Sequence, residues 1–565
     1  MKNKFKLILL TTLLLSSCGG VSEQSSQPSE SESPVESSTP VSSSELSSSE
    51  DQSSDISEDI SSSSEEVSED ISSSSEEVSE DISSSSEEVS EDISSSSEEV
   101  STPSDEPSSE ISSEPNEPIQ IHNEKNMTHF LGSDNDVYRI NITTENNEFP
   151  VDKENYVHGS LNITEQDENT VIKESMDMRI KLRGNSTLGA AKKPFRIKFD
   201  SKQSLFGLEK SKDWVLLANY YDKSNLRNYL AYLTANKMTN LGFQPSSIFV
   251  DVYFNGEYYG LFTLCEQMEV NPGRVDIEDN ISADGINSFL LEADERAKDE
   301  YKGYQGYAYI TSGGPRYGYY DFALKHPDAD DYVEAYELLQ DPEASDEDKE
   351  EANATVTQHL KDVVWLQDFL DNVSRAVYTR SNYEKYIDVP SFIDFYLVQE
   401  MFKNLDVGST SQYYVIDQAD EVVKLKAGPV WDFDLSAGVV DETSSDVYGG
   451  YMHTDLFMKA RDYYSKALFA DEEYLNLVKE RYTEIREDVI LSIFDELDLA
   501  KELLAAAQQR NIERWPLTQD RITWVEQYAL SANYYAIPTL QAHIDHLENT
   551  LKERLQIMDE AYLIA

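Results

Sequence analysis

Two aspartates separated by one residue, Asp432 and Asp434, are the side chains of this sequence best suited to chemistry. They lie in GPVWDFDLSAG (428–438), among bulky apolar neighbours. The residues VVKLKAGPV before them predict a strand that ends at the pair, with both carboxylates on one face and Trp431 and Phe433 on the other. Two converging carboxylates form a site for a hard divalent cation, Mg²⁺ or Mn²⁺. The alternative is a turn in which both aspartates face water.

A third aspartate, Asp406, precedes the pair in an order that indicates phosphoryl transfer. It lies in a short polar loop after a predicted helix. A strand, the turn DQADE and a second strand lead from it to Asp432. In protein kinases a loop Asp in this order accepts the proton of the attacking hydroxyl, and the later Asp holds Mg²⁺ on the nucleotide phosphates.

Six segments, of which two contain these aspartates, resemble, in order, the spore-coat protein H (CotH) family of atypical kinases. They are RIKLRGNST with KKPFRIKF (179–199), DWVLLANYYDKSNLRNYLA (213–231), VDVYFNGEYYGLFTLCEQ (250–267), FLLEAD (289–294), KNLDVGSTSQYYV (403–415) and AGPVWDFDLSAG (427–438). The resemblance implies a kinase-like fold that transfers the γ-phosphoryl group of ATP to Ser. It also implies that Asp406 is the catalytic residue and Asp432 a metal ligand.

The sequence departs from ordinary kinases at the second metal ligand. Kinases place an Asn five residues after the catalytic Asp. That position is Ser411 here, followed by Gln412, and neither is a strong substitute. Asp434 is therefore the candidate second ligand. No glycine-rich loop of the G-x-G-x-x-G type is present in the sequence.

The resemblance also implies a nucleotide-binding set in the first half of the chain. The turn RGNST could cover phosphates, a Lys on the following strand could pair with them, and a Glu could orient that Lys. The candidate residues are Arg183, Asn185, Ser186, Lys193, Lys198 and Glu266. The alternatives are solvated edge-strand lysines, a structural ion pair for the Arg, and an exposed position after a hairpin for the Glu.

Other chemistries have little support in the sequence. No G-x-S-x-G elbow or phosphate-binding P-loop is present. His543 and His546 lie three residues apart on a predicted helix, without an evident acidic or Cys partner, so we expect a solvated face. A glycosyltransferase that uses Asp-x-Asp is a weaker option, because it does not require the order around Asp406.

Strands are predicted mainly in the first half of the folded part. Apolar and polar residues alternate over 137–142, 176–182 and 194–199, as in half-buried strands. Two β-rich runs in 246–267 flank Asn255-Gly256, the preferred pair of a two-residue type I′ hairpin.

Helices are predicted mainly in the second half. One begins at Pro390-Ser391, and an amphipathic helix carrying Ile544 and Leu547 ends the chain, whereas 224–238 is a helix among the strands. We therefore expect an α+β, atypical protein-kinase-like fold of two lobes. The β-rich N-terminal lobe spans 126–325, and the helical C-terminal lobe with the aspartate motifs spans 326–565.

The N-terminus predicts a lipoprotein signal peptide over 1–18. Three lysines precede the apolar run Leu7–Leu15, which is too short to span a bilayer. Leu15-Ser16-Ser17-Cys18 resembles a bacterial lipobox, so we expect Cys18 to be lipidated and the protein to be extracytoplasmic and anchored to the cell membrane. The alternative is an ordinary secretory signal. Cys265 then has no disulfide partner and is expected in a strand as a small hydrophobe.

A Ser- and Glu-rich stalk is predicted over 19–125. The unit SEDISSSSEEV repeats four times from Ser57 to Val100, and residues 21–120 contain 29 acidic residues and no Lys or Arg. Charge repulsion and low hydrophobicity predict disorder. The formal net charge of the chain is −62, and the folded part is acidic too, which argues against nucleic-acid binding.

Two functions remain open from the sequence. The first is a surface-anchored, metal-dependent kinase that phosphorylates Ser or Thr of a protein, with its own stalk as one candidate substrate. The second is a surface binding or adhesion module for a surface ligand, on a catalytically inactive kinase-like scaffold. Little ATP is available outside a cell, which counts against the first.

Overall fold

The computed structural model describes residues 131–277, 282–316, 318–444, 452–517 and 523–564. All of them belong to one of the two compact units of the chain, Ile111–Ala565. The predicted signal peptide, Cys18 and the repeats lie outside the described residues. In the described ranges, none of the helices combines the length and the apolar character that a bilayer crossing requires.

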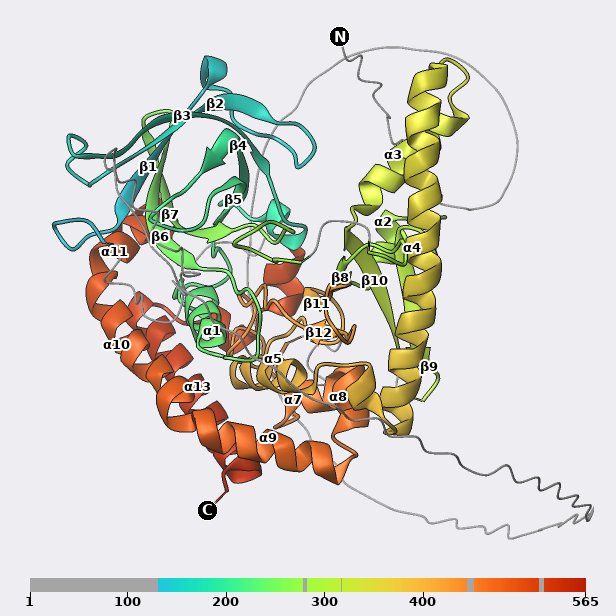
Figure 1. The fold of residues 1–565 in the computed structure, drawn as a ribbon. Helices are drawn as coiled ribbons and strands as arrows, with labels where there is room; N and C mark the ends of the chain where they lie inside the picture. The colour runs from blue at the N-terminus through green and yellow to red at the C-terminus, as the bar shows by residue number, and fades with distance from the viewer. Residues whose placement is uncertain (1–130, 278–281, 317, 445–451, 518–522, 565) are drawn as a thin grey trace, which may run out of the picture. The chain divides into compact units, whose positions relative to one another are not determined.

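Seven strands of the first half close into a barrel, with the order β1-β2-β3-β4-β5-β7-β6 (Figure 1). The strands are β1 (Tyr138–Thr144), β2 (Val157–Thr164), β3 (Val171–Leu182), β4 (Phe195–Gln203), β5 (Ser211–Leu217), β6 (Ser247–Phe254) and β7 (Glu257–Glu266). β1 closes the barrel by pairing in parallel with β6. The inward residues of the alternating pattern fill the interior, with Ile140, Ile180 and Ile197 fully buried.

The predicted hairpin is confirmed between β6 and β7. Asn255 and Gly256 have φ angles of 52° and 85°. A two-residue type I′ turn requires positive φ at both central positions, and Asn and Gly tolerate it best. Cys265 lies in β7 as a buried free thiol, also as predicted.

A second, five-stranded sheet has the order β12-β11-β8-β10-β9. Its strands are β8 (Phe289–Ala293), β9 (Tyr309–Gly314), β10 (Gly318–His326), β11 (Gln412–Ile416) and β12 (Lys426–Ala427). The predicted boundary at 325/326 falls within β10, so this sheet joins strands from both sides of it. The long helix α4 (Asp346–Thr379) runs beside the sheet and contacts β9 (Figure 1).

Helices make up most of the second half, so the chain is a mixed α+β fold, as predicted. Besides α1 (Arg227–Asn236) they include α5 (Val389–Phe402), α9 (Glu472–Ile485), α10 (Ser492–Leu503), α11 (Ala505–Arg514) and α13 (Leu540–Tyr562). α5 begins where predicted: the side chain of Asp388 accepts a hydrogen bond from the N–H of Ser391, with Pro390 in the first turn. Figure 1 shows α9, α10 and α11 following one another up to the barrel, where α11 contacts β7.

The prediction that His543 and His546 lie on a solvated face of α13 is wrong. His543 is buried with its ring 4.8 Å from the ring of Tyr534. Nε2 of His546 lies 2.8 Å from the carbonyl oxygen of Gly438. The segment after the aspartate pair and the residues before α13 cover this face of the helix. The spacing of residues within α13 does not reveal that another part of the chain packs there.

A buried arginine joins α1 to the segment that follows Asp434. Arg227 is fully buried and pairs with Asp222 at 2.5 Å, also fully buried. Its guanidinium donates to the carbonyl oxygens of Ser436 and Ala437, both at 2.9 Å. The carboxylate and these carbonyl oxygens offset the cost of burying the charge of Arg227.

We expect Arg227→Met to lower the free energy of unfolding by about 3–5 kcal/mol, because Asp222 is left as an uncompensated buried charge. The matched control is Lys552→Met, which removes an exposed i,i+4 pair with Glu548 and should cost at most about 1 kcal/mol. Urea titration monitored by circular dichroism measures both. Equal losses for the two variants would contradict this account of Arg227.

Candidate active site

A cleft of about 580 Å³ brings the three predicted aspartates together with the predicted turn. Asp406, Asp432 and Asp434 line it, and so do Arg183, Asn185 and Ser186. The turn follows β3 and includes a short 3-10 helix, Ser186–Gly189. The aspartates come from the loop after α5 and from the segment after β12. Residues from the barrel and from the second half of the chain therefore meet at this cleft.

The strand predicted to end at the aspartate pair is wrong. β12 stops at Ala427, and Asp432 has a φ of 63°, which lies in the left-handed region and not in the extended region of a strand. The backbone N–H groups of this irregular segment donate to side chains instead of a neighbouring strand. Val430, Asp432 and Phe433 donate to Gln244, Tyr232 and Asn228 at 2.9, 3.3 and 2.8 Å, respectively.

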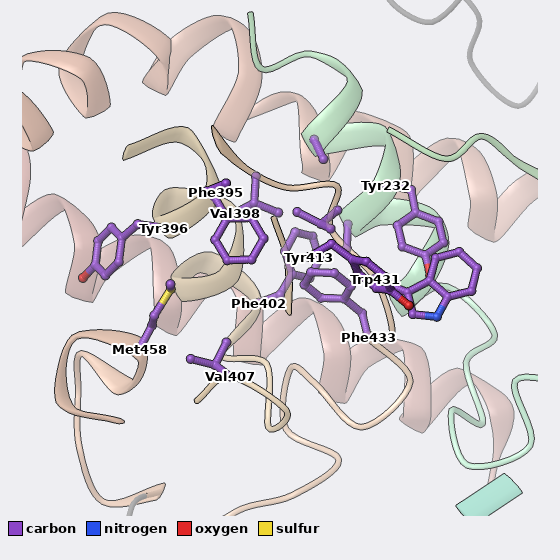
Figure 2. Close-up of a cluster of buried hydrophobic side chains, with 14 of the residues drawn as sticks. Tyr232, Phe395, Tyr396, Val398, Phe402, Val407, Tyr413, Trp431, Phe433 and Met458 are labelled. Carbon is purple, nitrogen blue, oxygen red and sulfur yellow. The ribbon is translucent and has the colours of Figure 1, made fainter. Parts of the chain in front are cut away.

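The aromatic neighbours of the aspartates anchor the segment in the core (Figure 2). The ring of Trp431 stacks on that of Tyr232, with 5.6 Å between centroids and 14° between planes. Phe433 is fully buried and meets Phe402 edge to face at 5.7 Å. These contacts hold Asp432 and Asp434 at the surface of a rigid apolar cluster, with the cleft on the other side.

The loop that carries Asp406 is held by its own backbone and by a nearby arginine. The carbonyl oxygen of Asp406 accepts bonds from the N–H groups of Ser409 and Thr410, both at 3.0 Å. The side chain of Asn404 accepts from the N–H of Asp406 at 3.2 Å, so it positions the loop. Arg461 donates to the carbonyl oxygen of Leu405 at 2.6 Å. The side chain of Asp406 is thereby left facing the cleft.

Burial, together with the repulsion of a neighbouring carboxylate, raises the pKa of two of these three carboxyl groups. Desolvation in the cleft, and then the charge of Asp432, raise the pKa of Asp406 to about 7. Burial, followed by the charges of Asp432 and Asp406, raises the pKa of Asp434 well above its usual range, and Asp434 hydrogen-bonds to Asp432. The arrangement is short of positive charge, which a divalent cation supplies.

The donor set fits a metal ion that keeps other ligands. Among the described residues, no three His, Cys, Asp or Glu side chains are arranged so that they could hold one metal ion. Asp432 and Asp434 would therefore hold it through their oxygens, and phosphate oxygens and water would complete the shell. Mg²⁺ is commonly bound in this way, through one or two carboxylates.

The residue positions that replace the kinase Asn differ in their roles. Ser411 lines the cleft. Both ends of the Gln412 amide are hydrogen-bonded within the protein. Its side-chain oxygen accepts from the N–H of Gly408 at 2.6 Å, and its nitrogen donates to Asp462 at 3.2 Å. Gln412 thus holds the Asp406 loop in shape and is not available as a metal ligand in this conformation.

Three of the predicted nucleotide-binding residues are not among those that line the cleft. Lys193 donates to the carbonyl oxygen of Leu188, and Lys198 lies 3.5 Å from Asp213. Glu266 is fully buried, 3.6 Å from Arg274, and accepts from the N–H of Ser246 at 3.0 Å. The predicted pairing of Glu266 with a phosphate-binding Lys is not found within the described residues, where the charged neighbour of Glu266 is Arg274.

Sequence reasoning missed cations and amides that do line the cleft. Lys181, Arg196 and Arg296 are among its lining residues. Arg296 binds Asp294 at 2.9 Å and also contacts Thr410, so it braces the Asp406 loop. Alternation in RIKLR places Lys181 on the same outward face as Arg183, and that spacing could have revealed it.

Two buried asparagines connect the barrel to the aspartate segment. Asn219 donates to Thr263 of β7 at 2.7 Å, and Asn228 donates to Asn219 at 3.1 Å. Asn228 in turn accepts from the N–H of Phe433, as described above. Both asparagines line the cleft. No local sequence pattern predicts this series of hydrogen bonds, because the residues that form it lie far apart in the chain.

The stability of the protein should depend on pH through Glu266. Burial is the main cause that raises its pKa to about 7, against 4.5 ordinarily. The protonated form is therefore favoured on folding, and this stabilisation is complete below pH 4.5 and lost as the pH rises through 7. Between these limits the wild type should lose about 3 kcal/mol relative to Glu266→Gln.

Urea titrations of both proteins at pH 5, 6, 7 and 8 measure this difference. The exposed residue Glu257 supplies the control, because Glu257→Gln should track the wild type at every pH. A constant offset between wild type and Glu266→Gln across the range would show that Glu266 is ionised throughout and would overturn the prediction.

Comparison with known proteins identifies the family of the chain. The family model described as CotH kinase protein matches residues 180–558, which include the β3 end, the Asp406 loop and the Asp432–Asp434 segment. A search among curated proteins finds no match. Membership of a kinase family implies a kinase-like function and, in general, the use of ATP and a divalent metal. The match covers about two thirds of the chain, and the chain therefore belongs to the CotH kinase family.

Proposed function

We propose that the protein is a metal-dependent kinase that transfers the γ-phosphoryl group of ATP to Ser or Thr of a protein. The convergence of Asp406, Asp432 and Asp434 in one cleft carries this proposal. In it, the barrel and the α-helical part with the five-stranded sheet act as the two lobes of a kinase-like arrangement. Asp406, Asp432 and Asp434 then stand on the second lobe and face the turn Arg183–Thr187 on the first.

Each residue has a definite task in the proposed reaction. Asp406 accepts the proton of the attacking hydroxyl, and its raised pKa makes it a better base near neutral pH than an ordinary carboxylate. Asp432 and Asp434 hold the cation, Mg²⁺ or Mn²⁺, which neutralises charge on the phosphates. Arg183 lies over the ring of Trp431 at 5.5 Å, beside Asp432, and adds positive charge there.

The place of action is part of the proposal. A lipid anchor at Cys18 would fix the protein to the outer side of the cell membrane, and residues 19–125 would separate the anchor from the kinase domain. The acceptor is then a protein of the cell surface or the Ser-rich repeats themselves. ATP has to reach that compartment, or transfer has to take place before export.

A second candidate function has one observation in its favour. Gln412 is committed to Gly408 and Asp462, and Ser411 is a poor ligand, so the site lacks the amide that completes the metal shell in ordinary kinases. A surface binding module on an inactive scaffold would show this feature. Asp434 removes the difficulty if it serves as the second ligand, which is why we favour the kinase.

Substitution of the base should abolish most activity. With radiolabelled ATP and Mg²⁺, we expect Asp406→Asn to lower the rate of Ser or Thr labelling by about 10²–10⁴, the usual loss of a general base. Asp200→Asn, at an exposed position of the barrel, is the control and should keep the wild-type rate. Equal labelling by wild type and Asp406→Asn, or none by either, would contradict a kinase.

Metal binding should depend on the aspartate pair. Calorimetric titration of the full chain with Mn²⁺ and a non-hydrolysable ATP analogue should give a metal-dependent nucleotide affinity. We expect Asp432→Asn and Asp434→Asn each to weaken it at least tenfold, because each removes a charged oxygen ligand. If Asp434→Asn binds like the wild type, Asp434 is not the second ligand. Tight binding without metal would contradict the whole arrangement.

A further inference from the structure

The outer face of the barrel carries like charges directly opposite one another. In the β3–β4 register, Arg179 pairs with Lys198 and Lys181 with Arg196. Their strand neighbours Met178, Ile180 and Ile197 are buried, so these four side chains stand on the outer surface. Like charges directly opposite destabilise a sheet. We call these four residues the basic ladder.

The protein itself neutralises only half of the basic ladder. Asp213 on β5 lies 2.8 Å from Arg196 and 3.5 Å from Lys198, and its side chain is 8% exposed. Arg179 and Lys181 form no ion pair with a carboxylate among the described residues. They lie over the ring of Tyr156, at 5.1 and 4.8 Å from its centroid. Burial, and then the charge of Arg196, lower the pKa of Lys181.

The basic ladder continues into the cleft. Lys181 and Arg196 line the cleft together with Arg183, whereas Arg179 and Lys198 are not among the lining residues. Positive charge therefore runs from the aspartate site outward over the barrel, on a protein whose formal net charge is −62. Such a strip attracts a long anionic ligand, of which one part enters the cleft and another lies outside it.

The chain contains a matching anionic segment. Each SEDISSSSEEV repeat of Ser57–Val100 has four carboxylates, five serines and no cation. The described chain begins at Leu131, which bridges to Val137 just before β1 of the same barrel. The thirty residues between Val100 and Leu131 can span at most about 100 Å. Because the repeats are covalently joined to the barrel, binding between the two would be intramolecular and would benefit from an effective concentration set by this linker.

We propose that the basic ladder binds the acidic, Ser-rich repeats of the chain's own N-terminal segment and presents their serines to the cleft. The binding stands by itself; phosphorylation of the repeats rests on the proposed function. In that step a bond forms between serine Oγ and the γ-phosphorus of ATP. The bond from that phosphorus to the bridging oxygen of ADP breaks, and the hydroxyl proton passes to Asp406.

The experiment uses the full chain in a form whose own repeats cannot compete. All Glu and Asp of Ser57–Val100 are changed to Gln and Asn, and the probe is a fluorescein-labelled peptide of residues 57–78. Fluorescence anisotropy without ATP or metal should show binding that weakens as salt is raised. We expect Arg179→Gln with Lys198→Gln to lower the affinity at least tenfold. Lys361→Gln with Lys552→Gln, at exposed positions outside the barrel, is the matched control.

Three other results would overturn the docking proposal. Equal affinity of the ladder variant and the control would place the peptide elsewhere. Equal binding of a peptide with Gln and Asn in place of its acids would remove the role of charge. Loss of ATP affinity without loss of peptide affinity would assign Arg179 and Lys198 to the nucleotide phosphates. Peptide binding without any phosphorylation would leave the docking intact and contradict only the proposed kinase.

Discussion

The gathering of Asp406, Asp432 and Asp434 in one cleft is the constraint on which the rest of the structure depends. Burial, and then the charges of neighbouring aspartates, raise the pKa of Asp406 and of Asp434. Such an arrangement persists only if the surrounding structure holds it, because each group alone would move toward water. Contacts that fix the two backbone segments offset the free-energy cost of holding these carboxyl groups together.

That scaffold comes mainly from α1, two hundred residues before the aspartate pair. Arg227 fixes the carbonyl oxygens of Ser436 and Ala437, Asn228 fixes the N–H of Phe433, and Tyr232 stacks on Trp431. The same helix is tied to the barrel through Asn219 and Thr263. A shift of the barrel relative to α1 would therefore move Asp432 and Asp434. The same contacts therefore stabilise the core and fix the geometry of the site.

The sequence predicts what depends on neighbouring residues and fails where partners are distant. The alternation of apolar and polar residues predicted β1, β3 and β4, and Asn255-Gly256 predicted the hairpin. Both signals depend only on residues that are close together in the sequence. The meeting of Asp406 with Asp432 followed from the order of elements. The irregular path at Asp432 could not be predicted, because its backbone partners are side chains of Gln244, Tyr232 and Asn228. Lys198 does not line the cleft and lies 3.5 Å from Asp213 on the next strand, a neighbour that the local pattern does not reveal.

The proposed function requires that phosphoryl transfer take place at this cluster of carboxylates with the help of a divalent cation. Phosphorus NMR of the full chain with ATP and Mg²⁺ tests it most directly, because it follows the γ-phosphate itself. The account predicts that the γ-phosphate signal declines while ADP and phosphoserine or phosphothreonine signals grow, and that Asp432→Asn leaves ATP intact. Identical spectra for wild type and Asp432→Asn, whether ATP is consumed or not, would contradict it.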